Sequence, residues 1–309
     1  MTATIYSGAR VFDGERLTDG PLRVADGVVT GPGPGREVRL DGGILAPGFL
    51  DLQVNGAGGR MVDGSCTADW LAEMCAIHGG LGATGILPTL ITDRPEATAV
   101  VIAAGVKAAR RQVPGFLGLH LEGPHLDPRR KGAHDPALIR PMTEDDLARL
   151  CEAAGQLPSL MVTLAPASAT PDQIARLSQA GVIVSLGHSD CTVAEAQAAM
   201  AAGARCVTHL FNAMSQLGNR EPGLVGAALT GPVHAGLIAD GIHVAPEAIR
   251  IAMAASDRLF LVSDAMAAAG SDLDEFQLNG RRILRRDGRL TLEDGTLAGA
   301  DLTLPQAVG

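Results

Sequence analysis

The chain has 309 residues, a length that accommodates one large domain or two smaller ones with a full hydrophobic core. Hydrophobic residues make up 46% and charged residues 19% of the sequence, which excludes disordered and fibrous proteins. The net charge of −9, with no Lys/Arg block that stands clear of acidic neighbours except Arg129 to Lys131, argues against nucleic acid as a partner.

We expect neither a membrane-spanning helix nor a secretion signal in this sequence. Its longest nearly uninterrupted apolar run, Ala97 to Val106, is far shorter than the about 20 residues that a membrane-spanning helix needs. The first ten residues, MTATIYSGAR, lack the basic and long apolar regions of a signal peptide. The five cysteines are odd in number and form no CxxC pair. We therefore expect reduced thiols and a cytoplasmic enzyme.

The first 46 residues contain short β-like segments separated by Asp-Gly and Gly-Pro pairs, including TIYSGARVF (4–12) and LRVADGVVTG (22–31). Such segments and turn residues are typical of β-hairpins. We expect residues 1–46 to form a small N-terminal β domain, built as an antiparallel sheet.

From Pro47 the pattern changes to apolar runs of strand length, each followed by an Ala-rich stretch with helical spacing. Continuous apolar runs are typical of parallel strands that are buried on both faces. Eight such runs occur, at Gly48–Val54, Thr84–Leu90, Gly115–Gly123, Met161–Pro166, Val182–Ser189, Ala204–Asn212, Val233–Gly241 and Leu259–Met266.

Helices are predicted between these runs, because several intervening segments begin with Thr or Pro and are followed by Gly. Eight strand–helix units predict an α/β fold with a (β/α)8 TIM-like barrel over residues 47–309, in preference to a doubly wound sheet. Asn-Gly and Asp-Gly pairs predict a β-hairpin excursion near 275–297. The helical segments are Thr67–Leu81, Pro95–Gln112, Thr143–Ala154, Pro171–Ala180, Thr192–Ala202 and Pro246–Ser256.

Polar residues lie at the carboxyl ends of the predicted strands, where the reactive groups of a (β/α)8 barrel are found. Alone, each one is as readily a hydrogen-bonded structural residue as a ligand. Together at one barrel mouth they favour a functional site. The third, fifth, sixth and eighth strands contribute Glu122, His188, His209 and Asp264.

Glu122, His188 and His209 offer one carboxylate oxygen and two imidazole nitrogens, which suits a divalent catalytic ion with an open position for water. Such an ion lowers the pKa of its water from about 15.7 to about 7. Asp264 remains to take a proton from that water and return it to a leaving amine. The set therefore predicts metal-assisted amide hydrolysis.

Nine motifs occur along the chain: PGFLDLQVNGAGG (47–59), HLEGPHL (120–126), KGAH (131–134), GHSD (187–190), THLFNAM (208–214), NREPGL (219–224), DGIHV (240–244), VSDAMAAAG (262–270) and TLAGADLT (296–303). In sequence and order they resemble the N-acetylglucosamine-6-phosphate deacetylases of the amidohydrolase superfamily. The resemblance implies hydrolysis of the acetamide of N-acetylglucosamine 6-phosphate to glucosamine 6-phosphate and acetate. It implies metal ligation by Glu122, His188 and His209, and acid–base catalysis by Asp264.

The same resemblance implies the contacts to the substrate. His134 would contact the sugar or polarise the carbonyl, and Arg220 and His243 would hold the phosphate. Arg220 is expected to reach across the interface of a homodimer. The further substrate contacts that it implies are Ala133, Asn212, Ala213, Leu297, Ala298 and Gly299.

One departure concerns the number of metal ions. Many superfamily members carry His-x-His on the first strand and a bridging lysine on the fourth, whereas this chain has Gln53-Val54-Asn55 and no lysine at the fourth strand. An amide does not replace imidazole as a strong zinc ligand. We expect one divalent ion per subunit, with Zn favoured and Fe, Mn or Co compatible. Gln53, Asn55 and His120 become hydrogen-bonding residues near the metal and its water.

A second departure lies at the end of the sequence. The chain stops at Gly309 within LTLPQAVG, the start of the last barrel helix. The family continues through that helix and returns to complete the small β domain. We therefore expect both the last helix and the N-terminal domain to be incomplete.

Two other functions stay open at this point. Another amidohydrolase, such as a deaminase or cyclic amidase, would share the metal site but would not depend on a phosphate. A non-catalytic sugar-phosphate-binding barrel would share the fold, although a binder has no need of a water-activating site.

Overall fold

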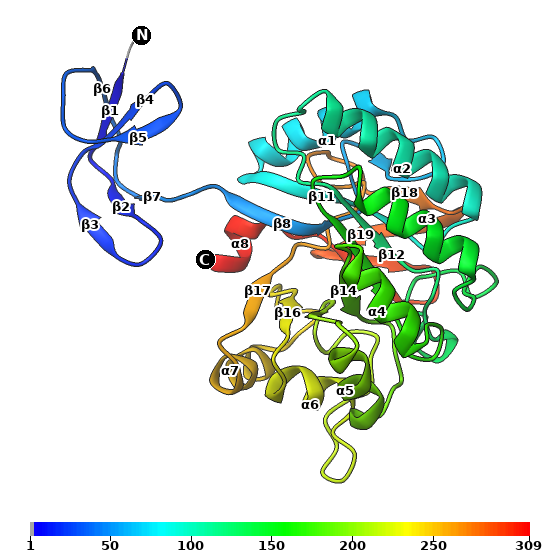
Figure 1. The fold of residues 1–309 in the computed structure, drawn as a ribbon. Helices are drawn as coiled ribbons and strands as arrows, with labels where there is room; N and C mark the ends of the chain where they lie inside the picture. Colours follow the sequence, from blue (N-terminus) through cyan, green and yellow to red (C-terminus); the bar gives the residue numbers. More distant parts are fainter. Residues whose placement is uncertain (1–2) are drawn as a thin grey trace. The chain divides into compact units, whose positions relative to one another are not determined.

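The computed structural model describes residues 3–309. The chain divides into two compact units, the first ending at Phe49 and the second beginning at Leu50 (Figure 1).

The N-terminal unit contains two small sheets. One has the order β5-β4-β1-β6 and the other the order β3-β2-β7. β1 pairs in parallel with β6, and β2 pairs in parallel with β7. The expectation of one antiparallel sheet is therefore wrong, because parallel pairing joins strands far apart in the sequence and local turn residues do not reveal it. The strands are β1 (Thr4–Ser7), β2 (Arg10–Phe12), β3 (Leu17–Asp19), β4 (Leu22–Ala25), β5 (Val28–Thr30), β6 (Arg36–Arg39) and β7 (Ile44–Leu45).

The second unit is a (β/α)8 barrel, as predicted. Eight strands form one sheet in chain order, with parallel pairing from β11 to β17. A parallel bridge between Val54 of the first strand and Ala265, in the segment after the last strand, closes the barrel. The strands are β8 (Phe49–Val54), β11 (Ala83–Ile91), β12 (Leu119–Glu122), β13 (Leu160–Leu164), β14 (Ile183–Leu186), β15 (Cys206–Val207), β16 (His234–Leu237) and β17 (Leu259–Leu261).

Helices surround these strands (Figure 1). Thr143, Thr170 and Thr192 form capping boxes at the starts of three of them, each satisfying backbone N–H groups that a helix start leaves unpaired. The helices are α1 (Ala68–Gly80), α2 (Pro95–Arg110), η1 (Pro128–Arg130), α3 (Glu144–Ala154), α4 (Pro171–Gln179), α5 (Val193–Ala201), α6 (Gly223–Thr230), α7 (Pro246–Ala255) and α8 (Leu304–Val308). Within residues 3–309, none of them is both long and apolar enough to cross a membrane.

The main core lies between the barrel strands and the helices around them. All five residues of β13 are buried, and Trp70, Leu71 and Met74 of α1 are almost completely enclosed. Burying a large apolar side chain contributes about 1.5–3 kcal/mol. This core fixes the strand ends that carry the polar residues.

After the eighth strand the chain forms a four-stranded antiparallel sheet in the order β18-β19-β20-β21. Asn279-Gly280 and Asp287-Gly288 join its first three strands, and all four residues have positive φ, as two-residue hairpin turns require. Phe276, Ile283 and Leu290 pack beneath this sheet against Met266 and its neighbours. The strands are β18 (Glu275–Leu278), β19 (Arg281–Arg286), β20 (Arg289–Leu292) and β21 (Leu297–Ala300), and a separate short hairpin contains β9 (Gly56–Ala57) and β10 (Arg60–Met61).

Candidate active site

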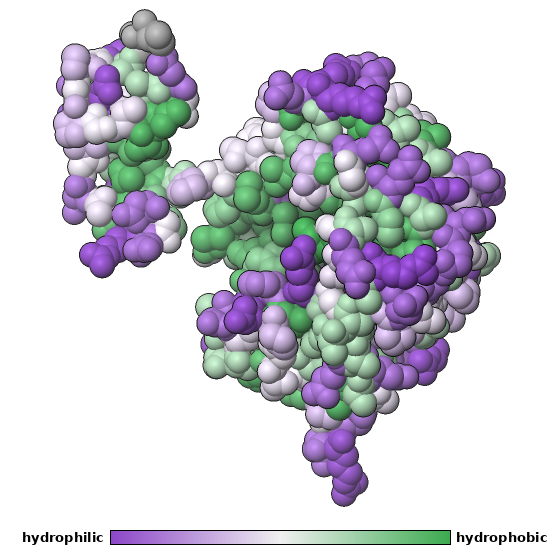
Figure 2. Space-filling view, in the orientation of Figure 1, coloured by the Kyte–Doolittle hydropathy of each residue, from purple (hydrophilic) through white to green (hydrophobic). Residues whose placement is uncertain are grey.

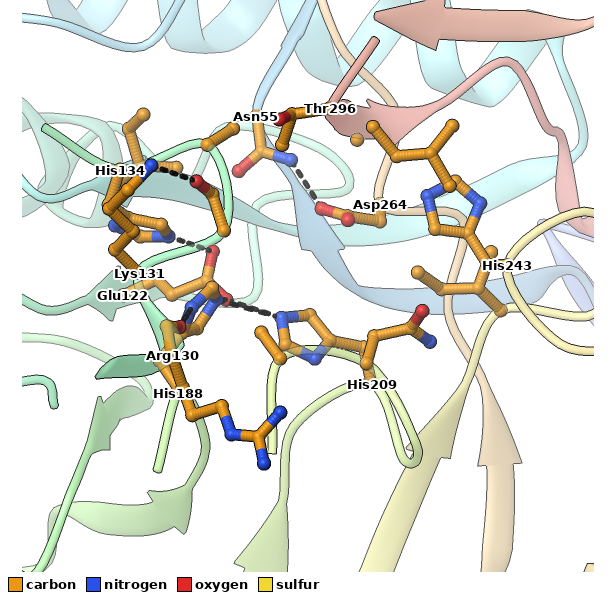
Figure 3. Close-up of a pocket in the computed structure, with 18 of the residues that line it drawn as sticks. Asn55, Glu122, Arg130, Lys131, His134, His188, His209, His243, Asp264 and Thr296 are labelled. Atoms are coloured by element: carbon orange, nitrogen blue, oxygen red, sulfur yellow. Dashed lines mark hydrogen bonds and ion pairs between the residues drawn. The ribbon is translucent and has the colours of Figure 1, made fainter. Parts of the chain in front are cut away.

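A cavity of about 600 Å³ opens at the carboxyl ends of the barrel strands (Figure 3). It contains the four residues expected at the catalytic centre. Seven of the nine implied substrate contacts and one of the three supporting residues also line it. The predicted residues in its wall are Asn55, Glu122, Ala133, His134, His188, His209, Asn212, Ala213, His243, Asp264, Leu297 and Gly299.

The backbone turns sharply where three of these side chains enter the cavity. His188, His209 and Asp264 follow β14, β15 and β17 and have φ values of 44°, 27° and 52°. Such left-handed conformations are uncommon for residues other than glycine and cluster at functional sites. They re-aim the side chain after a strand has ended, so that residues from separate strands converge.

Glu122 lies at the centre of this convergence. Its Oε1 is 3.2 Å from Nε2 of His188 and 3.0 Å from Nε2 of His209, and the two nitrogens are 3.1 Å apart. Burial alone would raise the pKa of Glu122, but the hydrogen bonds from the two imidazoles outweigh burial and hold it well below its usual value. Glu122 is therefore a buried carboxylate anion.

The three atoms suit a single metal ion. Ligands of a tetrahedral Zn²⁺ at 2.0–2.1 Å lie about 3.3 Å from one another, close to the 3.0–3.2 Å observed. Nδ1 of His188 donates to the carbonyl oxygen of Arg130 at 2.8 Å, so loss of the proton that Nε2 shares with Glu122 leaves a lone pair on Nε2 for a metal ion. Nδ1 of His209 is buried without a hydrogen-bond partner in the described chain. This donor set fits the predicted divalent ion.

His134 approaches the same carboxylate from the other side. Its Nε2 is 3.8 Å from Oε2 of Glu122, and its ring packs against that of His188 with a centroid distance of 4.2 Å. Ligand-type atoms of Glu122, His134 and His188 all lie within 4.8 Å of one another. Distance alone therefore admits His134 as a further imidazole in the cluster. Burial and then the neighbouring His188 lower the pKa of His134 well below its usual value.

Asp264 lies across the cavity from Glu122 (Figure 3). Its Oδ1 accepts a hydrogen bond of 2.7 Å from the side-chain amide of Asn55. Burial, followed by the negative charge of Glu122, raises the pKa of Asp264 to about 6. A carboxylate with this pKa is ionised near pH 7 and is a stronger base than an exposed aspartate.

Gln53 and His120 lie outside the cavity wall, below the cluster in the barrel interior. Gln53 donates to Oε1 of Glu122 at 3.1 Å, so it supports the carboxylate directly. His120 contacts Oγ1 of Thr163 at 2.7 Å and donates from Nδ1 to the carbonyl oxygen of Leu52 at 3.1 Å. Burial lowers its pKa to about 4, and it is neutral. His120 thus belongs to a hydrogen-bonded layer beneath the site.

At the opposite side of the cavity, His243 is oriented by a neighbouring acid. Oδ2 of Asp240 accepts a hydrogen bond of 2.6 Å from Nδ1 of His243, and Oδ1 accepts the backbone N–H groups of Ile242 and His243. Nε2 is left available to a ligand. Asn212 and Ala213 lie in the same wall, whereas Ala298 is completely buried and does not line the cavity.

Arg220 lies elsewhere. It belongs to the exposed segment 216–221 between β15 and α6, and the cavity wall of the described chain does not include it. In Figure 1 this segment extends as a yellow-green loop beyond α6, and Figure 2 shows a narrow hydrophilic protrusion there. One copy of the chain thus does not bring Arg220 to the site.

The basic cluster Arg129–Lys131, which sequence alone would leave as a solvated surface, lines the cavity. Arg129 pairs with Asp127, and Arg130 pairs with Asp190 at 2.7 Å. These pairs anchor the turn whose Arg130 carbonyl orients His188. The sequence signal that could have indicated these ion pairs was the presence of two acids, Asp127 just before the basic cluster and Asp190 in the GHSD motif.

Apolar wall residues and Thr92 were also missed. Thr92 contacts His134 through Oγ1 at 2.7 Å and through its backbone nitrogen at 3.3 Å. It lies just past β11, and extending the inspection of strand ends to the second strand would have found it. Thr92 lies behind His134 and not in the cavity wall, whose unpredicted residues besides Arg129–Lys131 are Ile91, Gly132, Ile238, Met266, Leu278, Gly295 and Thr296.

Comparison with known proteins agrees with this geometry. The amidohydrolase family matches residues 44–286. The N-acetylgalactosamine-6-phosphate deacetylase of Shewanella sp. (strain ANA-3) is 40% identical, over 98% of this chain and 80% of the relative. The N-acetylglucosamine-6-phosphate deacetylase of Haemophilus influenzae is 36% identical, over 88% of this chain and 72% of the relative. The crystal structure of the N-acetylglucosamine-6-phosphate deacetylase from Pasteurella multocida has a TM-score of 0.94 at 34% identity, over 99% of this chain and 83% of that chain.

The chain therefore belongs to the amidohydrolase family. Within it, the chain groups with the amino-sugar 6-phosphate deacetylases, whose named members include both glucosamine and galactosamine enzymes. The resemblance drawn from the sequence motifs is confirmed.

Proposed function

We propose that the protein hydrolyses the acetamide of N-acetylglucosamine 6-phosphate, or of its galactosamine epimer, with release of acetate. The observation that carries the proposal is the convergence of Glu122, His188 and His209 in one cavity with Asp264 facing them. The deacetylase relatives, with both epimers in their names, support the substrate class.

We assign the metal to Glu122, His188 and His209, with one divalent ion per subunit. The mutual distances of their ligand atoms support the assignment, as does the hydrogen bond that fixes Nδ1 of His188 and directs Nε2 toward Glu122. Zn²⁺ is the favoured ion because it accepts mixed nitrogen and oxygen ligands, and Fe, Mn and Co accept the same set. When bound, such an ion polarises a carbonyl oxygen and makes water more acidic.

The chain itself handles the proton. Asp264, ionised near neutral pH, takes a proton from water as the water oxygen bonds to the acetamide carbon. The same carboxyl group then gives that proton to the amide nitrogen as the carbon–nitrogen bond breaks. This transfer leaves Asp264 ionised again, and the products are the free amine and acetic acid, which loses its own proton to the amine or to water. Asn55 holds Asp264 in place throughout through its hydrogen bond.

The remaining wall residues bind the sugar phosphate in this proposal. His134 lies next to Glu122 and contacts the carbonyl or the sugar, whereas His243 lies on the opposite side with Nε2 available for the phosphate. This separation supports a substrate that spans the cavity. Sugar contacts are assigned to Ala133, Asn212, Ala213, Leu297, Ala298 and Gly299.

We assign Arg220 to bind the phosphate of the substrate that occupies the cavity of the neighbouring subunit in a homodimer. Its exposed position outside its own cavity supports the assignment. An Arg guanidinium offers paired donors that match phosphate oxygens.

A cytoplasmic location is also proposed. All five cysteines are free thiols, and four of them are buried. Unpaired cysteines of this kind are typical of reducing compartments.

Acetate release from the 6-phosphates of N-acetylglucosamine, N-acetylgalactosamine and N-acetylmannosamine tests the proposal, with metal analysis of the same sample. We expect turnover of at least one of the first two, loss with a chelator and recovery with Zn²⁺. The same sugars without phosphate serve as controls. Acetate release that does not depend on the phosphate would overturn a sugar phosphate as the substrate, and no acetate release from any of these sugars would favour a deaminase or cyclic amidase. Binding without turnover by the metal-loaded protein would favour a non-catalytic barrel.

A further inference from the structure

The rings of His134 and His188 pack against each other, yet their Nδ1 atoms meet backbone groups of opposite polarity. Nδ1 of His188 faces the carbonyl oxygen of Arg130, which only accepts hydrogen bonds. Nδ1 of His134 faces the backbone N–H of Thr92, which only donates, at 3.3 Å. The hydrogen of a neutral ring must therefore lie on Nδ1 in His188 and on Nε2 in His134.

The Thr92 side chain strengthens this arrangement. Its Oγ1 lies 2.7 Å from Nδ1 of His134, a much shorter approach than the 3.5 Å to the carbonyl oxygen of Glu122. The hydroxyl hydrogen is best placed on the line to Nδ1, which then accepts from two donors of one residue. A second hydrogen on His134 would have to stand between Nδ1 and the Thr92 N–H group, so this contact opposes the imidazolium form.

The sheet that follows the eighth strand holds the backbone next to both Thr92 and His134. Asn279 donates to the carbonyl oxygen of Thr92 at 3.3 Å, and Arg281 donates to that of Ala133 at 2.6 Å. Both come from the first hairpin of that sheet. One hairpin thus fixes the backbone on each side of the contact between Thr92 and His134.

We propose that Thr92 is a positioning residue that locks His134 in its Nε2–H tautomer, so that His134 donates a hydrogen bond to the acetamide carbonyl and does not ligate the metal. A metal ligand needs a lone pair on the nitrogen that faces the ion. Nε2 of His134 faces Glu122 at 3.8 Å but carries the hydrogen. The role toward the carbonyl rests on the proposed function, whereas the tautomer does not.

Nitrogen-15 NMR of histidine-labelled, metal-free full-length protein tests the tautomer directly, with the His134 signals assigned from their loss in His134→Gln. We expect an unprotonated Nδ1 and a protonated Nε2 in the wild type and in Thr92→Ser. Thr92→Val, which removes only the hydroxyl, should show exchange between tautomers. Thr98→Val is the matched control, because Thr98 lies in α2 and its hydroxyl bonds only to the carbonyl oxygen of Arg94.

Kinetics of the metal-loaded proteins complete the test. Thr92→Val should lower kcat by about tenfold or more with little change in KM or metal content, and Thr92→Ser should restore it. A protonated Nδ1 on His134 in the wild type overturns the proposal, as does a Thr92→Val protein with wild-type spectrum and kcat. The expected spectrum in a protein without deacetylase activity would support the tautomer and overturn the proposed function alone.

Discussion

The side-chain amide of Asn55 donates a hydrogen bond of 2.7 Å to Oδ1 of Asp264. It joins the first strand of the barrel to the segment after the eighth, beside the Val54–Ala265 bridge that closes the sheet. The bond lowers the pKa of Asp264, against the larger effects of burial and of Glu122 that raise it. The contacts that close the barrel and the hydrogen bond that tunes the pKa of Asp264 thus lie side by side.

Replacing Asn55 by Leu removes this donor. The pKa of Asp264 should rise further, because the ionised carboxylate loses a hydrogen bond. The acidic limb of the pH profile of kcat/KM should therefore move to higher pH, while metal content stays constant. Profiles of wild type and variant, measured on the same metal-loaded preparations, provide the check. An acidic limb at the same pH in both proteins would contradict the effect of Asn55 on the pKa of Asp264.

Asp264→Asn should lower kcat on the order of 10³-fold, because an amide cannot take the proton from water. Metal binding should survive, since the ligands assigned to the ion are Glu122, His188 and His209. The measurements are acetate release and metal stoichiometry. Asp272→Asn removes an exposed carboxyl in the following loop and is the control. Parallel loss of metal in Asp264→Asn would instead make Asp264 a ligand.

Mixed subunits test the role of Arg220. Arg220→Ala and Asp264→Asn homodimers should both be nearly inactive. Because Arg220 would serve the neighbouring cavity, a mixed dimer would contain one intact site. Equal mixing with subunit exchange should then recover about one quarter of wild-type activity. Sedimentation gives the oligomeric state. No recovery from a mixture proven to contain mixed dimers would place Arg220 outside the partner's site.

Titration of Asp51 should make the free energy of unfolding depend on pH. Burial raises its pKa from 3.8 to about 6, so the folded protein binds more protons than the unfolded chain between these values. Stability from this group is therefore greatest below about pH 4 and falls as pH rises to about 6, a change of about 3 kcal/mol. Asp51→Asn removes the titration but keeps an oxygen for the N–H of Ser263.

Urea unfolding of wild type and Asp51→Asn at a series of pH values measures this effect. The variant should gain stability relative to wild type as pH rises from about 4 to about 6. Asp272→Asn again provides the exposed control. A constant difference between wild type and Asp51→Asn over this range would show that Asp51 titrates normally.

The barrel was predictable because its strands are buried on both faces and read as continuous apolar runs. Helix α6 was not predicted, because seven of its eight residues are buried and the segment has no polar face to give a helical period. The parallel pairing of β1 with β6 was missed for a different reason. Pairing between distant strands depends on tertiary packing, which turn residues do not encode.

The candidate site likewise contains residues that the sequence predicts and residues that it does not. Glu122, His188, His209 and Asp264 lie at strand ends, where topology alone brings them together. The partners that orient them are less regular in sequence. Arg130 acts through its carbonyl oxygen and Thr92 partly through its N–H, and every residue type possesses these groups, so identity gives no hint of their role.

The left-handed backbone at His188, His209 and Asp264 sets a limit on engineering this enzyme. Each such residue costs about 1 kcal/mol or more, a strain that glycine would relieve. Selection for heat resistance alone would therefore favour variants that lose the proposed ligands and base. A thermostability screen should hold these three codons fixed and seek its gains elsewhere in the barrel.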